Sequence, residues 1–415
     1  MQANTKGGYA MRQSNHFRKD FPAKMQSLLD QLVHDKVCSG ACIAVGRSGE
    51  LTVRCESGWA NAEKKVPFSI STLFQMYSLT KPVTAVAVMQ LWDKGCFQLS
   101  DPVSKYLPSY ANMQVCHVSE DGTETLLPAK KQITIHDLLT MTGGLCYDGT
   151  GSIGKGIKSL AEGMIQSRVV GKPWDTIKFA NCLAEVPLLS EPSQQYKYSL
   201  GFDVLGALVE VWSGKPLDKY CQEHIFNPLG MKSTTFFITE AEKQELATSY
   251  EKGEAGNLIP RKTTSTPIIN AYTFENISYI SGGSGLICTL DDYFQFARML
   301  ANGGITDSGL TLISEAALKK ISTPQLTPQQ MVTFSQAGDT CLHADGYSYG
   351  YGVHVMKDPK NHLPVGEWGW AGTMGTWLSI DPVNKVFWVY AHQMVPAGYE
   401  DYIPKISKLI YSSLI

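Results

Sequence analysis

Several patterns that define common protein classes are missing from this chain of 415 residues. No window holds the roughly 18 apolar residues of a membrane-spanning helix, and the first twenty residues contain no apolar core of an export signal. Lysine and arginine number 36 against 38 aspartate and glutamate, so the chain lacks the basic excess typical of nucleic-acid binding. We therefore expect a cytoplasmic protein with no membrane span and no nucleic-acid partner; a protein exported with its signal removed would give the same pattern.

Signatures of metal sites and of two hydrolase classes are also missing. The ten cysteines form no Cys-x-x-Cys pair, and only Cys38 and Cys42 lie close together. Zinc knuckles and disulfide frameworks need clustered spacing, so we interpret the cysteines as reduced core thiols. There is no His-Glu-x-x-His zinc motif and no Gly-x-Ser-x-Gly elbow. We predict no metal, because ligand spacing is also missing among histidines 117, 136, 224, 343, 354, 362 and 392.

Residues 149–156, Gly-Thr-Gly-Ser-Ile-Gly-Lys-Gly, imitate two nucleotide-binding motifs. A phosphate-binding loop needs a preceding strand and a following helix, and Ser or Thr after its lysine. Here Gly156 follows Lys155, and the segment before residue 149 has the composition of a loop. We interpret these residues as a surface loop and predict no nucleotide or other organic cofactor.

The hydrophobic pattern predicts an α+β fold. With 43% hydrophobic residues, the chain can fill large cores. Strand patterns occur near both ends, at residues 41–45, 51–55, 350–356, 376–380 and 386–392, and helices are expected at 21–36, from 78 onward, at 290–300 and at 403–414. The middle is mostly helical, with segments at 135–141, 160–166, 201–212 and 217–226. We expect an α/β lobe with an antiparallel sheet flanked by helices, built from 20–95 and 280–415, an inserted all-helical lobe at 96–279, and an active site between them.

A serine three residues before a lysine occurs at three places: Ser78/Lys81, Ser152/Lys155 and Ser249/Lys252. Only the first pair opens an apolar helical run. Residues three apart share a helix face, so the Lys81 amine can lie against the Ser78 hydroxyl near the positive end of the helix dipole. Lys81 can then act as a base if burial lowers its pKa, or stay charged and lower the pKa of a neighbouring phenol. On these residues alone, a serine N-cap with a solvated lysine is the alternative.

Two later segments of the sequence can be interpreted together with the helix that begins at Ser78. Tyr198-Ser199-Leu200 follows a turn and precedes a helix, and Gly369-Trp370-Ala371-Gly372-Thr373 comes just before a strand, where small residues permit close backbone approach. A nucleophile helix, a tyrosine loop and a glycine-rich edge strand, in this order, form the three-box layout of penicillin-recognising serine enzymes. The chain resembles the class C β-lactamases and family VIII carboxylesterases of the β-lactamase/transpeptidase-like superfamily. Further segments match the family at residues 138–145, 226–231, 282–286, 292–293 and 349–352.

The resemblance implies a role for each matching residue. Ser78 would be the nucleophile, Tyr198 the general base and Lys81 its partner; which of the last two accepts the proton directly is left open. Backbone N–H groups of Ser78 and Thr373 would form the oxyanion hole. The family layout puts substrate-binding positions at Leu200, Trp370, Ala371 and Gly372 and suggests pocket loops at 147–154 and 279–284.

Two departures from the family pattern bear on the substrate. Leu200 stands where lactamases and peptidases have the asparagine that binds an acylamide, and Trp370 stands where they have the lysine or histidine that binds a carboxylate. Losing both polar anchors favours an apolar acyl or alcohol group. We therefore expect a carboxylesterase-like serine hydrolase acting on a small ester or amide through an acyl-Ser78 intermediate. The alternatives are a D-Ala-D-Ala carboxypeptidase or β-lactamase, an acyltransferase, and an inactive binding protein on this scaffold.

Overall fold

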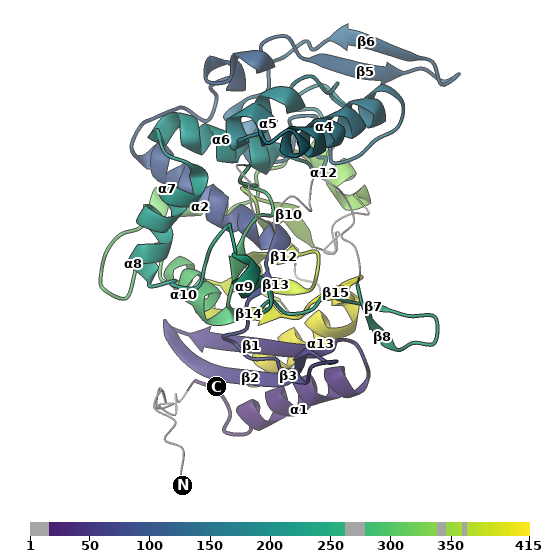
Figure 1. Ribbon diagram of the computed structural model, residues 1–415. Helices are drawn as coiled ribbons and strands as arrows, with labels where there is room; N and C mark the ends of the chain where they lie inside the picture. Colours follow the sequence, from purple (N-terminus) through teal and green to yellow (C-terminus); the bar gives the residue numbers. More distant parts are fainter. Residues whose placement is uncertain (1–15, 262–278, 338–345, 359–362) are drawn as a thin grey trace.

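The computed structural model describes residues 16–261, 279–337, 346–358 and 363–415 (Figure 1). His343, His362 and Cys341 lie outside the described residues. No helix within the described ranges is long and apolar enough to cross a membrane.

An eight-stranded sheet joins the two ends of the chain, in the order β10-β11-β12-β13-β14-β1-β2-β3. Every pairing in it is antiparallel, and the N-terminal strand β1 pairs with β14, where Ile43 lies opposite Tyr390. The strands are β1 Gly40–Arg47, β2 Glu50–Asn61, β3 Val66–Pro67, β10 Tyr347–Tyr349, β11 His354–Met356, β12 Trp368–Gly372, β13 Thr376–Asp381 and β14 Val386–Ala391. The predicted antiparallel α+β class is confirmed.

Helices cover both faces of this sheet. On one face, α1 (Phe21–His34) and α13 (Tyr399–Ser412) pack together and share a core with β1, β13 and β14. The buried residues of α1 follow a helical spacing, so its apolar stripe faces the sheet. On the other face, α10 (Leu290–Ala301) packs on β1, β13 and β14. Figure 1 shows α1 and α13 at one end of the molecule and the hairpin of β5 (Gln114–Val118) and β6 (Glu124–Pro128) at the other.

Helix α2 (Thr80–Asp93) runs through the interior. A short 3₁₀ turn, η1 (Tyr77–Leu79), leads directly into it, as the helix predicted from residue 78 requires. Every residue of α2 from Thr80 to Leu91 is buried, because α6 (Gly201–Ser213), α7 (Leu217–Cys221) and α11 (Glu315–Ile321) pack around it. The first turn of α2 is therefore held rigidly inside the protein.

Three predictions about local structure were wrong. Residues 151–156 are not a loop but open α4 (Gly151–Val169), where the Ser152 N–H and hydroxyl bond to Glu124. The predicted strand at 350–356 is interrupted, because residues 350–353 form a turn with Gly352 at φ +76°. The middle segment also contains two hairpins, β5–β6 (Gln114–Val118, Glu124–Pro128) and β7–β8 (Tyr250–Lys252, Leu258–Pro260). The two-lobe boundaries near residues 95 and 280 stay a prediction.

The remaining elements connect these layers. The helices are α3 Ile135–Leu139, α5 Thr176–Leu183, α8 Asn227–Leu229, α9 Glu240–Lys243 and α12 Pro328–Gln336, with single turns η2 Val103–Lys105, η3 Pro108–Tyr110 and the π-type η4 Gln222–Phe226. The short strands are β4 Phe74–Gln75, β9 Ile287–Cys288 and β15 Met394–Val395. Strand β4 pairs with β9, and β15 pairs with β7 in parallel.

Candidate active site

A strained turn presents Ser78 at the start of α2. Tyr77, just before it, has φ +47°, a left-handed conformation that an L-residue with a side chain adopts only at a cost. The Thr80 hydroxyl donates to the Tyr77 carbonyl at 2.6 Å, and the Met76 N–H donates to the Leu286 carbonyl at 2.9 Å. These bonds hold the turn, and they fix the position of Ser78 relative to α2.

Lys81 lies against Ser78, as their spacing on the helix predicted. Its Nζ donates to Ser78 Oγ at 3.1 Å, to the Gly283 carbonyl at 2.8 Å and to the Tyr147 hydroxyl at 3.3 Å. The side chain is 0% exposed, and this burial lowers the pKa of Lys81 to about 7, against the opposing charge of Asp203. A solvated lysine is thus excluded, and the N-cap position of α2 belongs to Leu79.

Tyr198 completes the cluster from the loop before α6. A hydrogen bond of 2.7 Å joins its hydroxyl to Ser78 Oγ, and Lys81 Nζ lies 4.6 Å from the centroid of its ring. The ring also packs beside Tyr147 and Trp370, with centroids 5.6 and 5.8 Å away. The three side chains expected to react are therefore in mutual contact, although they come from positions up to 120 residues apart in the chain.

Gly372 brings strand β12 next to the serine turn. Within β12, the residues that pair with β11 are Trp368 and Gly369, so the far end of β12 can pack on η1. A Cβ at residue 372 would lie 2.2 Å from the Met76 carbonyl oxygen, so only glycine permits this approach. Thr373 follows at the exposed start of the turn into β13. The backbone at 372–373 is thus close to the Ser78 turn, where an oxyanion hole would need it.

The expected substrate-binding side chains differ in where they point. Trp370 is 3% exposed and packs among the rings of Tyr198, Tyr349 and His354, so it forms a wall beside Tyr198. Ala371 faces the opposite side of the sheet, in the core shared with α1 and α13, because side chains alternate along a strand. Only its backbone can face the site. Leu200 is 1% exposed and packs in the main core at the start of α6.

Tyr147 and Gly283 are partners of Lys81 within the two loops suggested from the family layout. Their individual roles were not foreseen, because an aromatic residue and a glycine in a loop carry no signal of a contact with a distant lysine. Asp203 was missed entirely. It lies in the first turn of α6, five residues after Tyr198, and its charge acts on Lys81.

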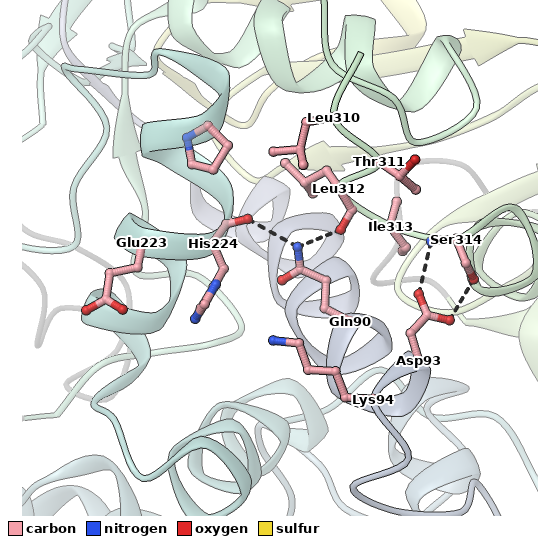
Figure 2. A pocket seen from close by; sticks show the side chains of 11 residues that line it. Gln90, Asp93, Lys94, Glu223, His224, Leu310, Thr311, Leu312, Ile313 and Ser314 are labelled. Carbon is pink, nitrogen blue, oxygen red and sulfur yellow. Dashed lines mark hydrogen bonds between the residues drawn. The ribbon is translucent and has the colours of Figure 1, made fainter. Parts of the chain in front are cut away.

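A cavity of about 590 Å³ lies at the end of α2 far from Ser78 (Figure 2). It is bordered by the end of α2, by η4 and α8, and by residues 310–314. The Gln90 amide donates to the carbonyls of His224 and Leu312, and Asp93 accepts from the N–H and hydroxyl of Ser314. The 14 residues of α2, about 21 Å of helix, lie between its Lys94 and the turn that carries Ser78. These polar groups fasten α2 to its neighbours and take no part in the serine cluster.

No group of three or more potential metal ligands occurs in the ranges that the structure describes. His136 bonds to Tyr351 and His392 to Tyr390, so both rings have partners in the fold. The nine cysteines of the described ranges are unpaired, and burial raises the pKa of the Cys38 thiol to about 12.

The burial of Lys81 predicts a dependence of stability on pH. The unfolded chain keeps the lysine proton up to its ordinary pKa of 10.5, whereas the folded protein releases it near 7. Because the unfolded state binds more protons in this window, the free energy of unfolding should rise as the pH rises from 7 to 10.5. Lys81→Met removes this titration. In urea unfolding at several pH values, the free energy of unfolding of the unsubstituted protein should therefore increase relative to that of the variant as the pH rises from 7 to 10.5. Lys155→Met replaces an exposed lysine, so its free energy of unfolding should differ from that of the unsubstituted protein by the same amount at every pH. A constant difference for Lys81→Met would contradict the lowered pKa.

Comparison with known proteins places this chain among related sequences and folds. The sequence model of the family described as Beta-lactamase matches residues 25–405. The chain is 29% identical to an uncharacterized protein of Mycobacterium tuberculosis, covering 89% of this chain and 90% of that one. It is also 29% identical to Esterase EstB of Burkholderia gladioli, covering 84% of each. The solved structure of EstCE1, described as a hydrolase with promiscuous acyltransferase activity, superposes with a TM-score of 0.76 at 23% identity, over 95% of this chain and 99% of that one.

The match over nearly the whole chain shows that this protein belongs to the Beta-lactamase family, within the β-lactamase/transpeptidase-like serine hydrolase superfamily. The resemblance deduced from the three boxes is confirmed, and so is the β-lactamase/transpeptidase-like form of its α+β fold. Relatives of this chain include Esterase EstB and a protein described as a "Putative D-alanyl-D-alanine carboxypeptidase", so the family defines a class of serine hydrolase and leaves the substrate open.

Proposed function

We propose that the protein is a carboxylic ester hydrolase that forms a covalent acyl-enzyme on Ser78. The observation that carries this proposal is the contact of Ser78 Oγ with both Lys81 Nζ and the Tyr198 hydroxyl, at 3.1 and 2.7 Å. A serine hydroxyl becomes a good nucleophile when an adjacent base removes its proton, and these are the two groups within reach of it.

In the first half-reaction, Ser78 Oγ attacks the ester carbonyl and passes its proton to the Tyr198 phenolate, which the Lys81 ammonium stabilises. The negative charge that develops on the carbonyl oxygen is stabilised by the backbone N–H groups of Ser78 and Thr373. The tetrahedral intermediate collapses, the ester C–O bond breaks, and the departing alcohol takes the proton from Tyr198. In the second half-reaction, water attacks the acyl group, Tyr198 accepts a proton from it, and the acid leaves as Ser78 regains its proton.

The residues around the cluster favour an ester over an anionic peptide or β-lactam. Trp370 and Leu200 occupy the two positions that resemble the polar anchors of lactamases and peptidases; Leu200 has no hydrogen-bonding side chain, and Trp370 has no charge to pair with a carboxylate. A site without these anchors gains little from a negatively charged substrate, whereas the indole of Trp370 suits an apolar acyl or alcohol group. Similarity to Esterase EstB supports the same choice. An alcohol in place of water would make the second half-reaction an acyl transfer, the activity that the description of EstCE1 adds to hydrolysis.

Intact-mass spectrometry tests the proposal directly. The protein is exposed to p-nitrophenyl butyrate and, separately, to a penicillin, quenched with acid, and weighed; the adduct is then mapped by peptide sequencing. We expect ester turnover with a butyryl adduct on Ser78 and no stable penicillin adduct. A stable penicillin adduct on Ser78 without ester turnover would assign the protein to the peptidase and lactamase branch. Failure of both substrates and of a fluorophosphonate probe to modify Ser78 would indicate an inactive binding protein.

A further inference from the structure

Asp203 is a buried carboxylate that no step of the proposed reaction uses. It lies in the first turn of α6, is 1% exposed, and accepts three hydrogen bonds on one oxygen. Oδ1 accepts from the Tyr279 hydroxyl at 2.6 Å, from the Ser281 hydroxyl at 2.5 Å and from the Gly283 N–H at 3.4 Å. A charge is expensive to bury unless it is paired or hydrogen-bonded, so such a group needs a reason to be there.

The three donors all belong to the segment that holds Lys81. The Gly283 carbonyl accepts from Lys81 Nζ at 2.8 Å, and the Gly282 carbonyl accepts from the Thr84 hydroxyl at 2.7 Å. The backbone of this segment also lies directly on α6, since a Cβ at residue 282 would be 2.3 Å from the Phe202 carbonyl oxygen. Asp203 therefore anchors, through Oδ1, the peptide whose carbonyl orients the lysine amine.

The second oxygen of Asp203 faces the same peptide from the side of Tyr147. A Cβ built on Gly283 would lie 2.8 Å from Asp203 Oδ2 and 3.3 Å from the Tyr147 hydroxyl, which itself contacts Lys81. Within the described ranges Oδ2 has no hydrogen-bond partner, although it is fully buried. Its charge is therefore poorly screened and acts through a low-dielectric interior on the nearby ammonium.

In the part of the chain that the structure describes, Lys81 contacts Ser78, Tyr147, Tyr198 and the Gly283 carbonyl. Asp203 contacts Tyr279, Ser281 and the Gly283 N–H, and its field also reaches Tyr110. The Asp203 charge raises the pKa of Lys81 against the effect of burial. Burial raises the pKa of Asp203 itself, while its hydrogen bonds and Lys81 lower it. The two titrations are coupled, so removing one charge must change the other.

We propose that Asp203 is a positioning residue of the active site: its carboxylate fixes the Gly283 carbonyl against Lys81 and supplies the negative charge that balances the Lys81 ammonium beside Ser78. This inference rests on the acyl-enzyme chemistry proposed above. Leu200 precedes α6 and packs in the main core, so it offers Lys81 no polar group. Asp203, in the first turn of α6, provides the polar support for the lysine through Gly283.

Asp203→Asn separates charge from shape. The amide oxygen can still accept from Tyr279 and Ser281, but the negative charge is gone. The readout is the rate at which a fluorophosphonate labels Ser78 as a function of pH, followed by intact mass. Because Lys81 then loses its proton more easily, we expect the midpoint of the pH profile to move to lower pH by about one unit or more. Glu210→Gln, a half-buried carboxylate two turns further along α6, is the matched control and should keep the midpoint of the unsubstituted protein.

The outcomes separate this inference from the proposed function. If the unsubstituted protein is not labelled, the acyl-enzyme proposal fails first. If it is labelled, and Asp203→Asn is labelled more slowly at every pH with an unchanged midpoint, the carboxylate has only a structural role and the inference is overturned. Should Asp203→Asn not fold, Ser281→Ala removes one anchor and retains the charge. It should lower the maximal labelling rate by several-fold, and an unchanged rate would overturn the positioning role.

Discussion

Ser78→Ala is expected to lower kcat/KM for short p-nitrophenyl esters by on the order of 10⁴-fold or more. Without the serine nucleophile no acyl-enzyme can form, so Lys81 and Tyr198 also lose their catalytic effect. Binding should survive, since the hydroxyl adds little to the buried surface, and the thermal midpoint should stay close to that of the unsubstituted protein. Initial rates and thermal unfolding of the two proteins measure both effects.

The chain offers a matched control for this substitution. Ser152 also stands three residues before a lysine, but at the start of α4, where its hydroxyl bonds to Glu124. Ser152→Ala should leave ester turnover unchanged and reduce stability slightly through the lost hydrogen bond. If Ser78→Ala retained most of the activity, or if Ser152→Ala abolished it, the assignment of the nucleophile would be wrong.

Tyr198→Phe is expected to lower kcat for the same esters by about 10²- to 10⁴-fold, the usual contribution of a general base. The ring and its packing against Trp370 are kept, and only the hydroxyl that contacts Ser78 Oγ at 2.7 Å is removed. KM should change little, because the lost interaction acts on the proton of the serine rather than on the bound ester.

Tyr147→Phe is the informative comparison for Tyr198. Both phenols contact the cluster, but the Tyr147 hydroxyl bonds to Lys81 rather than to Ser78. We expect a smaller decrease in kcat for Tyr147→Phe, together with a shift in the pH profile. If Tyr198→Phe kept most of its activity, Lys81 would be the immediate base. The sequence left open which of Tyr198 and Lys81 accepts the serine proton directly.

The elements with a strong local pattern were predictable from the sequence. The amphipathic stripe of α1, the strands β1 and β2, and the apolar helix that begins near Ser78 all formed where the hydrophobic pattern predicted them. The pairing of Ser78 with Lys81 was predictable for the same reason, since three-residue spacing on a helix determines a shared face. The weaker elements failed where local signals were short or ambiguous. The glycines of 149–156 indicated a loop, yet the hydrogen bonds of Ser152 to Glu124 and the burial of Ile153, Leu160 and Met164 stabilise a helix there.

The sequence by itself determined the fold class, the family and the serine, lysine and tyrosine that the motifs mark, because these depend on periodicity and on the order of short segments. Only the tertiary structure decided which distant groups surround them. Lys81 is buried among Tyr147, Gly283 and Asp203, which come from three separate segments and have no fixed spacing from it. The pKa of the lysine depends on that burial and on the charge of Asp203. Desolvation and Coulomb interactions act through space, so they emerge only when the chain is folded.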